Sequence, residues 1–429
     1  MKKVAIIGSG VSGMGAAYAL KDHFDVHVFE KHDYAGGHTS TVDIDEGDRV
    51  VGVDTAFMVC NPMNYPKLFK LFETLGVEIK THSGGFNFFN LDTHEYFGTP
   101  ELEKDEAFVK EHYSAEFYEI WRQAERLHSE ALRDLLDGKT FIALREYLSA
   151  RGYTEAFMNG YLMQLITAYW SLPIEDMLDM PASTVLNFFA NHGKDGLGGK
   201  KVSWFTVKGG SKRYLEKIQA ALPHPVSLNA PVEAIRPHQG GVMLRIGGQE
   251  AWFDYAIAAA HADQTLGMLT EPTDFQASML SCFRYHASET VLHTDAAVVP
   301  VPRDRLASWN YGRITRDGRI EPFLVYHMNG IQGLEAKNDY FVSLNSPIPI
   351  DPAKVVKSFH YEHPILDMGT YAVQKELQKI NRGGPIYFAG SYFSIKTHGP
   401  DFAGFHESGY ASGVEAARSL LRDAGPAAA

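Results

Sequence analysis

Three glycines near the start of the chain constrain its fold more than any other feature of the sequence. Residues 3–7 (KVAII) form a short apolar run, which is typical of a buried parallel strand, and the GxGxxG spacing of residues 8–13 follows at once. A helical pattern and a second apolar segment at 25–29 come next, and this segment ends in Glu30. Strand, glycine turn, helix and strand together predict a βαβ unit.

The spacing within this unit is that of a dinucleotide-binding site. The first glycine permits the tight turn, the second lets the backbone approach a pyrophosphate, and the third lets helix and strand pack closely. The start of the helix supplies N–H donors to the anion, and Glu30 is placed to accept hydrogen bonds from a ribose. A purely structural glycine turn would leave Glu30 unexplained. The predicted binding residues in this unit are Gly8, Gly10, Ser12, Gly13, Glu30 and Lys31.

A second glycine-rich segment lies near the end of the chain. The apolar run 386–390 ends in glycine, a loop follows, and the segment 404–413 carries glycines before a helical pattern that starts at about Tyr410. A helix beginning here would direct N–H groups at a flavin ring and stabilise the negative charge that develops there on reduction. Gly409 and Gly413 would let this helix pack closely on the cofactor and on the first helix. The predicted binding residues are Gly390, Ser391, Gly404, Phe405 and His406.

These blocks resemble the flavin-containing amine oxidase superfamily, which also contains enzymes similar to phytoene desaturase and protoporphyrinogen oxidase. Three further stretches support the resemblance: a glycine pair at 209–210 before a helix, a strand that starts at about Pro231, and a return strand around 254–260. All of these blocks follow the order of the family along the chain. The resemblance therefore implies an α/β fold with an FAD-binding, Rossmann-like domain of the glutathione-reductase type.

The resemblance also assigns residues to FAD outside these two segments. A glycine pair just beyond the acid has no role in NAD enzymes, whereas in these flavoproteins it contacts the pyrophosphate from a second side. His38 stands where many relatives have arginine, so any charge that it contributes depends on pH. The resemblance adds Gly36, Gly37, His38, Thr39 and Val232, whose backbone would meet the adenine.

Other stretches resemble one bacterial branch of NAD/FAD-binding proteins that is associated with modification of membrane lipids, including acyl-chain methylation and desaturation. They are 292–295 (LHTD), 308–311 (SWNY), 361–364 (YEHP) and 404–409 (GFHESG). This resemblance implies a lipid-type substrate. It predicts an FAD-dependent oxidoreductase that desaturates an apolar fatty-acyl chain by hydride transfer to the flavin N5. An amine oxidase that releases peroxide and a flavin-dependent double-bond isomerase are the alternatives.

Catalytic side chains are harder to assign, because a flavin carries the redox chemistry itself. No nucleophile or triad is needed, and the sequence shows no Cys/His cluster with metal-ligand spacing, so no metal is expected. Phe405 holds the aromatic position of the C-terminal motif. His406 is a candidate proton shuttle, with a structural hydrogen bond as the alternative. The other candidates, each of which could equally belong to the core, are His293, Trp309 and Tyr326.

The order of the blocks predicts two intertwined domains. Residues 101–200 have a mainly helical pattern, whereas residues 263–374 alternate as strands do. Residues 157–189 are rich in leucine, methionine and aromatic side chains, which predicts either core helices or the lining of a long apolar tunnel. The predicted FAD-binding domain comprises 1–65, 205–262 and 375–425, and the predicted substrate domain, a discontinuous mixed sheet with helices, comprises 66–204 and 263–374.

Composition excludes several other classes of protein. A net charge of −12 argues against nucleic-acid binding, and the sequence lacks a run of about 18 apolar residues that would predict a membrane span. Cys60 and Cys282 fit a reducing compartment, and neither lies near the C-terminal motif, so FAD is expected to be non-covalent. We expect a cytoplasmic protein with peripheral membrane contact at most, and a buried first strand rather than a signal peptide. The sequence gives no indication of an oligomeric state.

Overall fold

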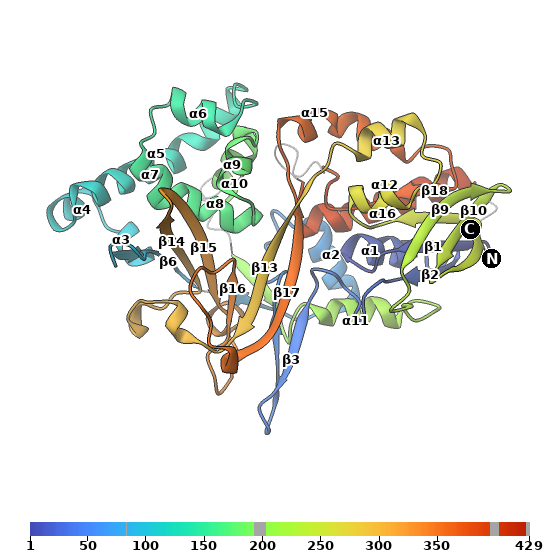
Figure 1. Ribbon diagram of the computed structural model, residues 1–429, viewed down its shortest axis with the longest axis horizontal. Coiled ribbons are helices and arrows are strands. Elements are labelled where there is room, and N and C mark those ends of the chain that lie inside the picture. Colours follow the sequence, from blue (N-terminus) through green and yellow to red (C-terminus); the bar gives the residue numbers. More distant parts are fainter. Residues whose placement is uncertain (83, 193–202, 395–402, 426–429) are drawn as a thin grey trace.

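The computed structural model describes residues 1–82, 84–192, 203–394 and 403–425. Figure 1 shows two parts side by side: a parallel sheet flanked by helices at the end where both termini lie, and a larger sheet with a group of helices at the other end. This mixture of helices and sheets confirms the α/β fold predicted from the sequence.

Within the described residues, four parallel strands form the sheet nearest the termini, in the order β18-β12-β1-β2. Alternate residues of a strand face opposite sides, and β1 follows this rule. Val4 and Ile6 belong to the core on one face, whereas Ala5 and Ile7 belong to the core on the other. The strands are β18 (Ile386–Phe388), β12 (Tyr255–Ala258), β1 (Lys3–Ile7) and β2 (Asp25–Phe29).

Helices and a small antiparallel sheet cover the two faces of this parallel sheet. On one face the core includes residues of α1 (Val11–Leu20), α11 (Lys212–Ala220) and α16 (His406–Ala424). On the other face lies a sheet in the order β11-β10-β9, formed by Gln249–Phe253, Gly241–Ile246 and Val232–His238. Both faces of the parallel strands are therefore buried, which explains why their sequences are continuously apolar.

The larger sheet has the order β17-β13-β16-β15-β14-β6-β7 within the described residues. Only the pair β14 and β6 is parallel among its described ladders. Its strands are β17 (Val355–Pro364), β13 (Tyr285–His293), β16 (Phe341–Leu344), β15 (Arg319–His327), β14 (Trp309–Arg316), β6 (Phe86–Asn90) and β7 (Tyr96–Gly98).

Helices cover this larger sheet at the end of the molecule away from the termini (Figure 1). The longest is α5 (Ala115–Leu136), and α8 (Met163–Trp170) and α10 (Ala182–His192) pack with it in one apolar core that also contains Phe88 and Tyr311 of the sheet. Many side chains of residues 157–189 lie in this core, which favours core helices over a tunnel lining for most of that stretch.

The remaining elements connect these layers. β3 (Thr41–Asp45) and β4 (Val50–Asp54) form a hairpin that projects at the lower edge of Figure 1, and β5 (Ile79–His82) pairs with β8 (Trp204–Val207). The other α-helices are α2 (Pro66–Leu75), α3 (Thr99–Leu102), α4 (Glu106–His112), α6 (Leu144–Ala150), α7 (Glu155–Phe157), α9 (Ile174–Leu178), α12 (Ala262–Met268), α13 (Asp274–Leu280), α14 (Met328–Gln332) and α15 (Met368–Leu377).

The two large sheets draw their strands from different parts of the chain. The strands of the parallel sheet fall within 1–65, 205–262 and 375–425, and those of the seven-stranded sheet within 66–204 and 263–374. We keep the division into an FAD-binding and a substrate domain as a proposal. None of the helices in the described residues is long and apolar enough to cross a membrane.

Helices α1 and α16 pack with their backbones in close approach. A Cβ added to Gly413 would lie 1.9 Å from the Ser12 carbonyl oxygen, and one added to Gly409 would lie 2.9 Å from Val11 Cγ1. A Cβ on Gly15 would lie 2.8 Å from the ring of Tyr410. The contact therefore requires glycine on both helices, as the small residues of the C-terminal motif predicted.

Replacing Gly413 with alanine should destabilise the protein by about 1–3 kcal/mol, because the methyl group would overlap backbone that has no room to move. Gly267 in α12 is the matched control, since an added Cβ there meets no atom within 4 Å. Gly267→Ala should raise stability by up to about 1 kcal/mol through helix propensity alone. Thermal unfolding of both variants measures the difference, and equal melting temperatures would contradict the proposed close packing.

Candidate functional site

The first glycine turn connects β1 to α1, with Gly10 at the N-terminal cap of the helix. Gly8 has a φ of +101°, and an added Cβ would lie 2.8 Å from the Ala259 carbonyl oxygen. A Cβ on Gly13 would lie 1.9 Å from the Gly8 carbonyl oxygen. Gly10, in contrast, has extended backbone angles and no atom within 4 Å of an added Cβ. The described chain therefore explains two of the three glycines, and open space adjoins the third.

Glu30 lies directly after β2 and is buried. Its Oε2 accepts hydrogen bonds from the Ser9 backbone N–H (3.0 Å) and from Ser9 Oγ (2.6 Å). Its Oε1 accepts a third from the His32 backbone N–H (3.0 Å). The buried Glu30 therefore stabilises the glycine turn through hydrogen bonds. This role is additional to the predicted contact with a ribose.

Two other predicted residues lie close to Glu30. Lys31 is exposed. The Ala230 backbone N–H donates to the Glu30 carbonyl oxygen at 2.8 Å, which brings the start of β9 beside the acid. Val232 is the first residue of that strand and is partly buried. The adenine-side residue predicted from the family resemblance thus lies next to the predicted ribose-side acid.

The second glycine pair lies against the first turn. The Gly36 backbone N–H donates to Ser9 Oγ (3.1 Å), and a Cβ on Gly37 would lie 3.4 Å from Gly10 Cα. The Thr39 N–H donates to the Gly36 carbonyl oxygen (2.9 Å) and closes the second turn. The two N-terminal glycine segments, which are separated by a helix and a strand in sequence, are therefore adjacent in space.

His38 and His363 form a pair of buried imidazoles beside this second turn. Their ring centroids lie 4.9 Å apart, and His38 lies 4.9 Å from the ring of Tyr361. Among the described residues, His38 Nε2 and His363 Nδ1 are buried without a hydrogen-bond partner. Burial lowers the pKa of His38 well below its usual value and that of His363 to about 4, so both rings are neutral at pH 7.

The sequence analysis did not include His363 among the predicted site residues. The available signal was its position two residues after Tyr361, because residues i and i+2 of a strand face the same side. The spacing predicts that the two side chains share a face of their strand, but it does not predict that this strand lies beside His38.

The C-terminal segment returns to this region. Gly390 follows β18, and its backbone N–H donates to Ser412 Oγ in α16 at 2.9 Å. The Gly404 N–H donates to the Ser391 carbonyl oxygen at 2.7 Å. Ser12, in the first turn of α1, is buried, and its carbonyl oxygen lies against α16. Part of the loop between strand and helix, residues 395–402, lies outside the described residues.

Helix α16 begins at His406, four residues before the start predicted from its apolar pattern. The reason is local: Ser408 Oγ accepts a hydrogen bond from the Phe405 backbone N–H at 3.0 Å, which caps the first turn. Apolar periodicity carries no information about such a cap, so the prediction placed the helix start too late.

Glu407 links this helix to α2. Its side chain accepts hydrogen bonds from the backbone N–H groups of Lys67 (2.8 Å) and Leu68 (3.0 Å), in the first turn of α2. A carboxylate at this position satisfies donors that have no partner within the helix. Burial raises the pKa of Glu407, an effect that the two N–H donors partly offset. The buried Glu407 therefore anchors the start of α16 to α2.

His406 occupies an enclosed polar pocket. Its Nε2 lies 2.5 Å from the Tyr214 hydroxyl and 3.3 Å from Thr39 Oγ1, and its ring stacks on Phe57 with centroids 3.9 Å apart. Burial lowers the pKa of His406 to about 3, so the imidazole is neutral. These contacts favour a positioned, uncharged hydrogen-bonding group and bring the C-terminal motif to Thr39 of the second glycine turn.

Phe405, which precedes His406 in the chain, belongs to an aromatic region next to this pocket. Its ring lies 5.8 Å from Trp170 in an edge-to-face arrangement. The adjacent Tyr169 keeps 37% of its surface accessible, yet burial raises its pKa to about 12. The two observations agree if the accessible surface of Tyr169 faces an enclosed space within the protein rather than bulk water.

Two further candidates adjoin Tyr169. Trp309 and Tyr326 face each other across β14 and β15, and Trp309 also packs on His82 with ring centroids 4.6 Å apart. Burial and then the nearby Tyr169 hydroxyl raise the pKa of Tyr326. Three of the five candidate catalytic residues, Phe405, Trp309 and Tyr326, therefore pack against one aromatic core, whereas His406 lies in the polar pocket described above.

His293 lies elsewhere. Its Nε2 is 2.7 Å from Ser343 Oγ, its Nδ1 accepts a hydrogen bond from the Asp295 backbone N–H (3.1 Å), and its ring stacks on Phe341. His286, which pairs with His363, is seven residues earlier on β13, a separation of roughly 23 Å along a strand. This environment favours the alternative of a satisfied core histidine.

Comparison with known proteins decides the family. A family model described as flavin containing amine oxidoreductase matches residues 11–294. The chain belongs to this family. As an amine oxidoreductase family member it is a flavin-dependent oxidoreductase, and the family implies FAD as its cofactor, as predicted from the glycine segments.

A curated protein matches a short part of this chain. The chain is 51% identical to 1-hydroxycarotenoid 3,4-desaturase of Flavobacterium sp. (strain P99-3) over 45 residues, which cover 10% of this chain and 9% of that enzyme. The match thus spans less than a tenth of the relative's length.

Solved structures share the whole fold of this amine oxidoreductase. Cyclohexylamine oxidase from Brevibacterium oxydans IH-35A has a TM-score of 0.69 at 16% identity, with 99% of both chains covered. The CLA-producing fatty acid isomerase from P. acnes has a TM-score of 0.67 at 16% identity, covering 98% of this chain and 99% of that one. Putrescine oxidase bound to putrescine has a TM-score of 0.67 at 17% identity, with the same coverage.

The described residues fit a flavin nucleotide. Open space adjoins Gly10 at the start of α1, where a pyrophosphate would meet the helix N-terminus. Two buried imidazole nitrogens, of His38 and His363, have no partner among the described residues and would gain one from a polar cofactor.

The stability of the protein should fall as the pH is lowered below about 6.5. The pKa values of His406 (about 3) and His363 (about 4) lie below the value of about 6.5 expected when unfolded, so only the unfolded chain binds protons in this range. Each ring should contribute up to about 1.4 kcal/mol per pH unit between pH 6.5 and its folded-state pKa.

Urea unfolding at several pH values between 7 and 4.5 tests this sign. His406→Gln should flatten the slope of unfolding free energy against pH, whatever its effect on stability at pH 7. The exposed His360 provides a control, because His360→Gln removes an imidazole that is hydrated before and after unfolding. An unchanged slope in His406→Gln would contradict the neutral, buried state of this ring.

Proposed function

We propose that the protein binds FAD non-covalently, with the adenosine end at the first glycine turn and the flavin end at the start of α16. The adjacency of the two N-terminal glycine segments and the Thr39 contact of His406 support this path. The proposed binding residues are Gly8, Gly10, Ser12, Gly13, Glu30, Lys31, Gly36, Gly37, His38, Thr39, Val232, Gly390, Ser391, Gly404, Phe405 and His406.

The cysteines support a non-covalent cofactor. Cys60 Sγ contacts the Phe205 carbonyl oxygen at 3.8 Å, and burial raises the pKa of its thiol to about 12. A thiol held protonated is a poor nucleophile. Cys282 lies in the turn after α13, and its Sγ contacts the Ser278 carbonyl oxygen. Cys60 lies near Glu407 of the C-terminal motif, whose negative charge adds to the rise in the pKa of the thiol.

Gly10→Ala should abolish most FAD binding while the apoprotein keeps its stability. The added methyl group meets no protein atom and the backbone angles suit any residue, so only a ligand close to Gly10 would oppose it. We expect affinity to fall roughly tenfold or more, equivalent to about 1.4 kcal/mol. Flavin content by absorbance and apoprotein melting temperature are the measurements. Gly384→Ala, also without neighbours, should keep its flavin; unchanged FAD affinity in Gly10→Ala would contradict the proposed path.

We further propose that the substrate is an apolar, fatty-acyl type of molecule, which the enzyme dehydrogenates. The bound flavin would supply the hydride acceptor. The supporting observation is the aromatic region beside the C-terminal motif. Phe405 packs edge-on to Trp170, Trp309 pairs with Tyr326 across two strands, and Tyr326 lies near Tyr169. Burial keeps the tyrosines of this region neutral.

A neutral, aromatic lining favours an uncharged chain because burying an ammonium group without a counter-charge is costly. The fatty acid isomerase and the carotenoid desaturase among the related proteins are consistent with an apolar substrate. The remaining roles would fall to the neutral His406, which could hold or pass a proton, and to the aromatic rings, which would exclude water. Cyclohexylamine oxidase and putrescine oxidase, with the same fold, make amine oxidation the second candidate.

Anaerobic mixing of the flavin-loaded protein with phospholipid vesicles that carry monounsaturated acyl chains should bleach the oxidised flavin absorbance. Mass spectrometry should then find lipid lighter by two hydrogens. Bleaching by cyclohexylamine or putrescine, but not by lipid, would overturn the proposal in favour of amine oxidation. A moved double bond without loss of hydrogen would overturn dehydrogenation in favour of isomerisation.

Two tryptophan variants test whether the substrate binds in the aromatic region. Trp309→Ala should lower kcat/KM for the accepted substrate roughly tenfold or more, because it removes a wall of the aromatic region. Trp252 is an exposed tryptophan on β11, and Trp252→Ala should leave the rate unchanged. Equal rates in the two variants, with both proteins folded, would place the substrate elsewhere.

A further inference from the structure

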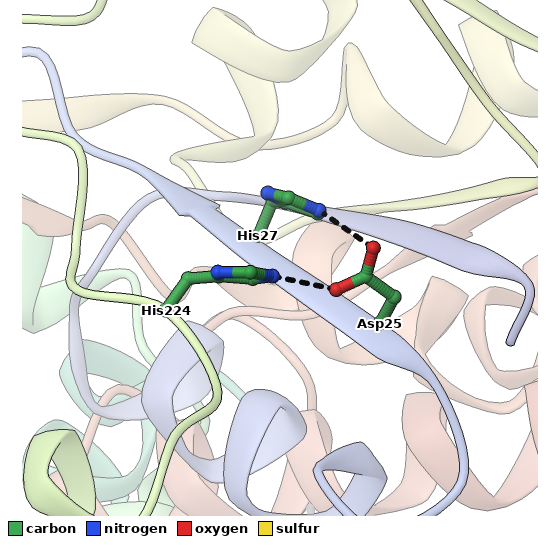
Figure 2. A group of neighbouring side chains, drawn as sticks. All are labelled: Asp25, His27 and His224. Carbon is green, nitrogen blue, oxygen red and sulfur yellow. Dashed lines mark hydrogen bonds and ion pairs between the residues drawn. The ribbon is translucent and has the colours of Figure 1, made fainter.

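A cluster of two histidines and an aspartate lies away from the proposed cofactor site. Asp25 and His27 belong to β2, and His224 lies in the loop between α11 and β9 (Figure 2). Asp25 is the first residue of β2 and Glu30 follows the last, so the cluster is roughly 16 Å along the strand from the predicted ribose contact. None of these three residues has a part in the proposed oxidoreductase chemistry.

The side chains converge on one point. Asp25 and His27 are two residues apart on a strand and therefore face the same side. His27 Nε2 lies 3.2 Å from Asp25 Oδ2, and His224 Nε2 lies 2.6 Å from Asp25 Oδ1. One nitrogen from each ring and a carboxylate oxygen all lie within 4.8 Å of one another. Figure 2 shows both rings directed at the carboxylate.

The main chain holds this arrangement in place. The loop that carries His224 is tied to β2 by two backbone hydrogen bonds, from Ser227 N–H to the Val28 carbonyl oxygen and from Glu30 N–H to the Ser227 carbonyl oxygen, both 2.9 Å. The His27 ring packs edge-on to Phe253 and stacks on His224 with centroids 4.4 Å apart. The main chain that carries the three side chains is therefore in place before any ligand binds.

The charge in the cluster suits a cation. In the described part of the chain, the side-chain contacts of the Asp25 carboxylate are the two imidazoles, with no lysine or arginine among them. The carboxylate and the two imidazoles together offer oxygen and nitrogen atoms to a cation.

We propose that Asp25, His27 and His224 bind a divalent transition-metal ion, with Zn²⁺ as the preferred ion. Imidazole and carboxylate are ligands of Zn²⁺ at about 2.0–2.2 Å, which sets the edges of a tetrahedral site at about 3.3 Å. The 3.2 Å separation of His27 Nε2 and Asp25 Oδ2 already matches one edge. His224 Nε2 contacts the other carboxylate oxygen at 2.6 Å and has to turn to complete the site, and its side chain is 43% exposed. Water would complete the fourth position.

The position of the site indicates what the metal would do. It would clamp the loop of His224 onto the outer strand of the parallel sheet, far from the flavin end. We therefore expect metal binding to stabilise the folded protein without changing the flavin spectrum. Sequence reasoning found no metal site because His224 is distant in the chain from the other two ligands, and no spacing motif joins them.

The test uses the full-length, flavin-loaded protein without an affinity tag, first treated with EDTA and then dialysed. Titration with Co²⁺ should produce visible d–d absorption that saturates at one ion per chain and is displaced by Zn²⁺. Zn²⁺ should also raise the melting temperature, since it binds the folded state only. His224→Ala and Asp25→Asn should each weaken binding tenfold or more.

Controls separate a built site from general surface binding. His360→Ala removes an exposed histidine outside the cluster and should keep the wild-type affinity. His224 lies on a loop, so its variant should fold even if a variant of the strand residue His27 does not. Absence of saturable Co²⁺ binding, or equal binding by wild type, His224→Ala and Asp25→Asn, would overturn the proposal.

Discussion

The two ends of the chain meet where α1 packs on α16, and glycines on both helices bring the two backbones into close approach. Gly413 lies against the carbonyl oxygen of Ser12, and Gly13 lies against Gly8 within the first turn. This contact fixes where the C-terminal motif lies relative to the first glycine turn. The strand order β18-β12-β1-β2 then completes the sheet from segments that are distant in sequence. Everything proposed for the cofactor depends on this approach, because it brings two sets of backbone N–H groups to one region.

The loss of hydration of histidine side chains is a second physical constraint on the site. His38, His363 and His406 are partly buried, and the loss of hydration lowers the pKa of all three imidazoles, which keeps them neutral. Buried polar atoms without partners are costly, and His38 Nε2 and His363 Nδ1 are such atoms among the described residues. A polar cofactor that formed hydrogen bonds with these two nitrogens would remove that cost. An arginine in place of His38 would instead bring a permanent charge to the same position.

Local spacing predicted the parts of this structure that depend on short-range sterics. The turn at Gly8, Gly10 and Gly13 could be predicted from its spacing, and Gly13 indeed packs on Gly8 five residues away. Gly8 itself meets Ala259, far along the chain, and an added Cβ on Gly10 meets no described atom within 4 Å. The strand that contains His293 was also predicted, but its position along the sheet was not, because register depends on partners far away in the sequence. The same limit explains why His363 and Tyr169 were missed. The place of each residue in the site depends on contacts with side chains of other helices, strands or loops. The start of α16 was misplaced because a serine cap leaves no trace in apolar periodicity.

Glu407 connects the C-terminal motif to helix α2, a contact that the sequence of the motif does not predict. The carboxylate closes the first turn of α2 through the N–H groups of Lys67 and Leu68, and it is the immediate neighbour of His406. A displacement of α2 would therefore be transmitted through this one buried side chain to the first turn of α16, which begins at His406.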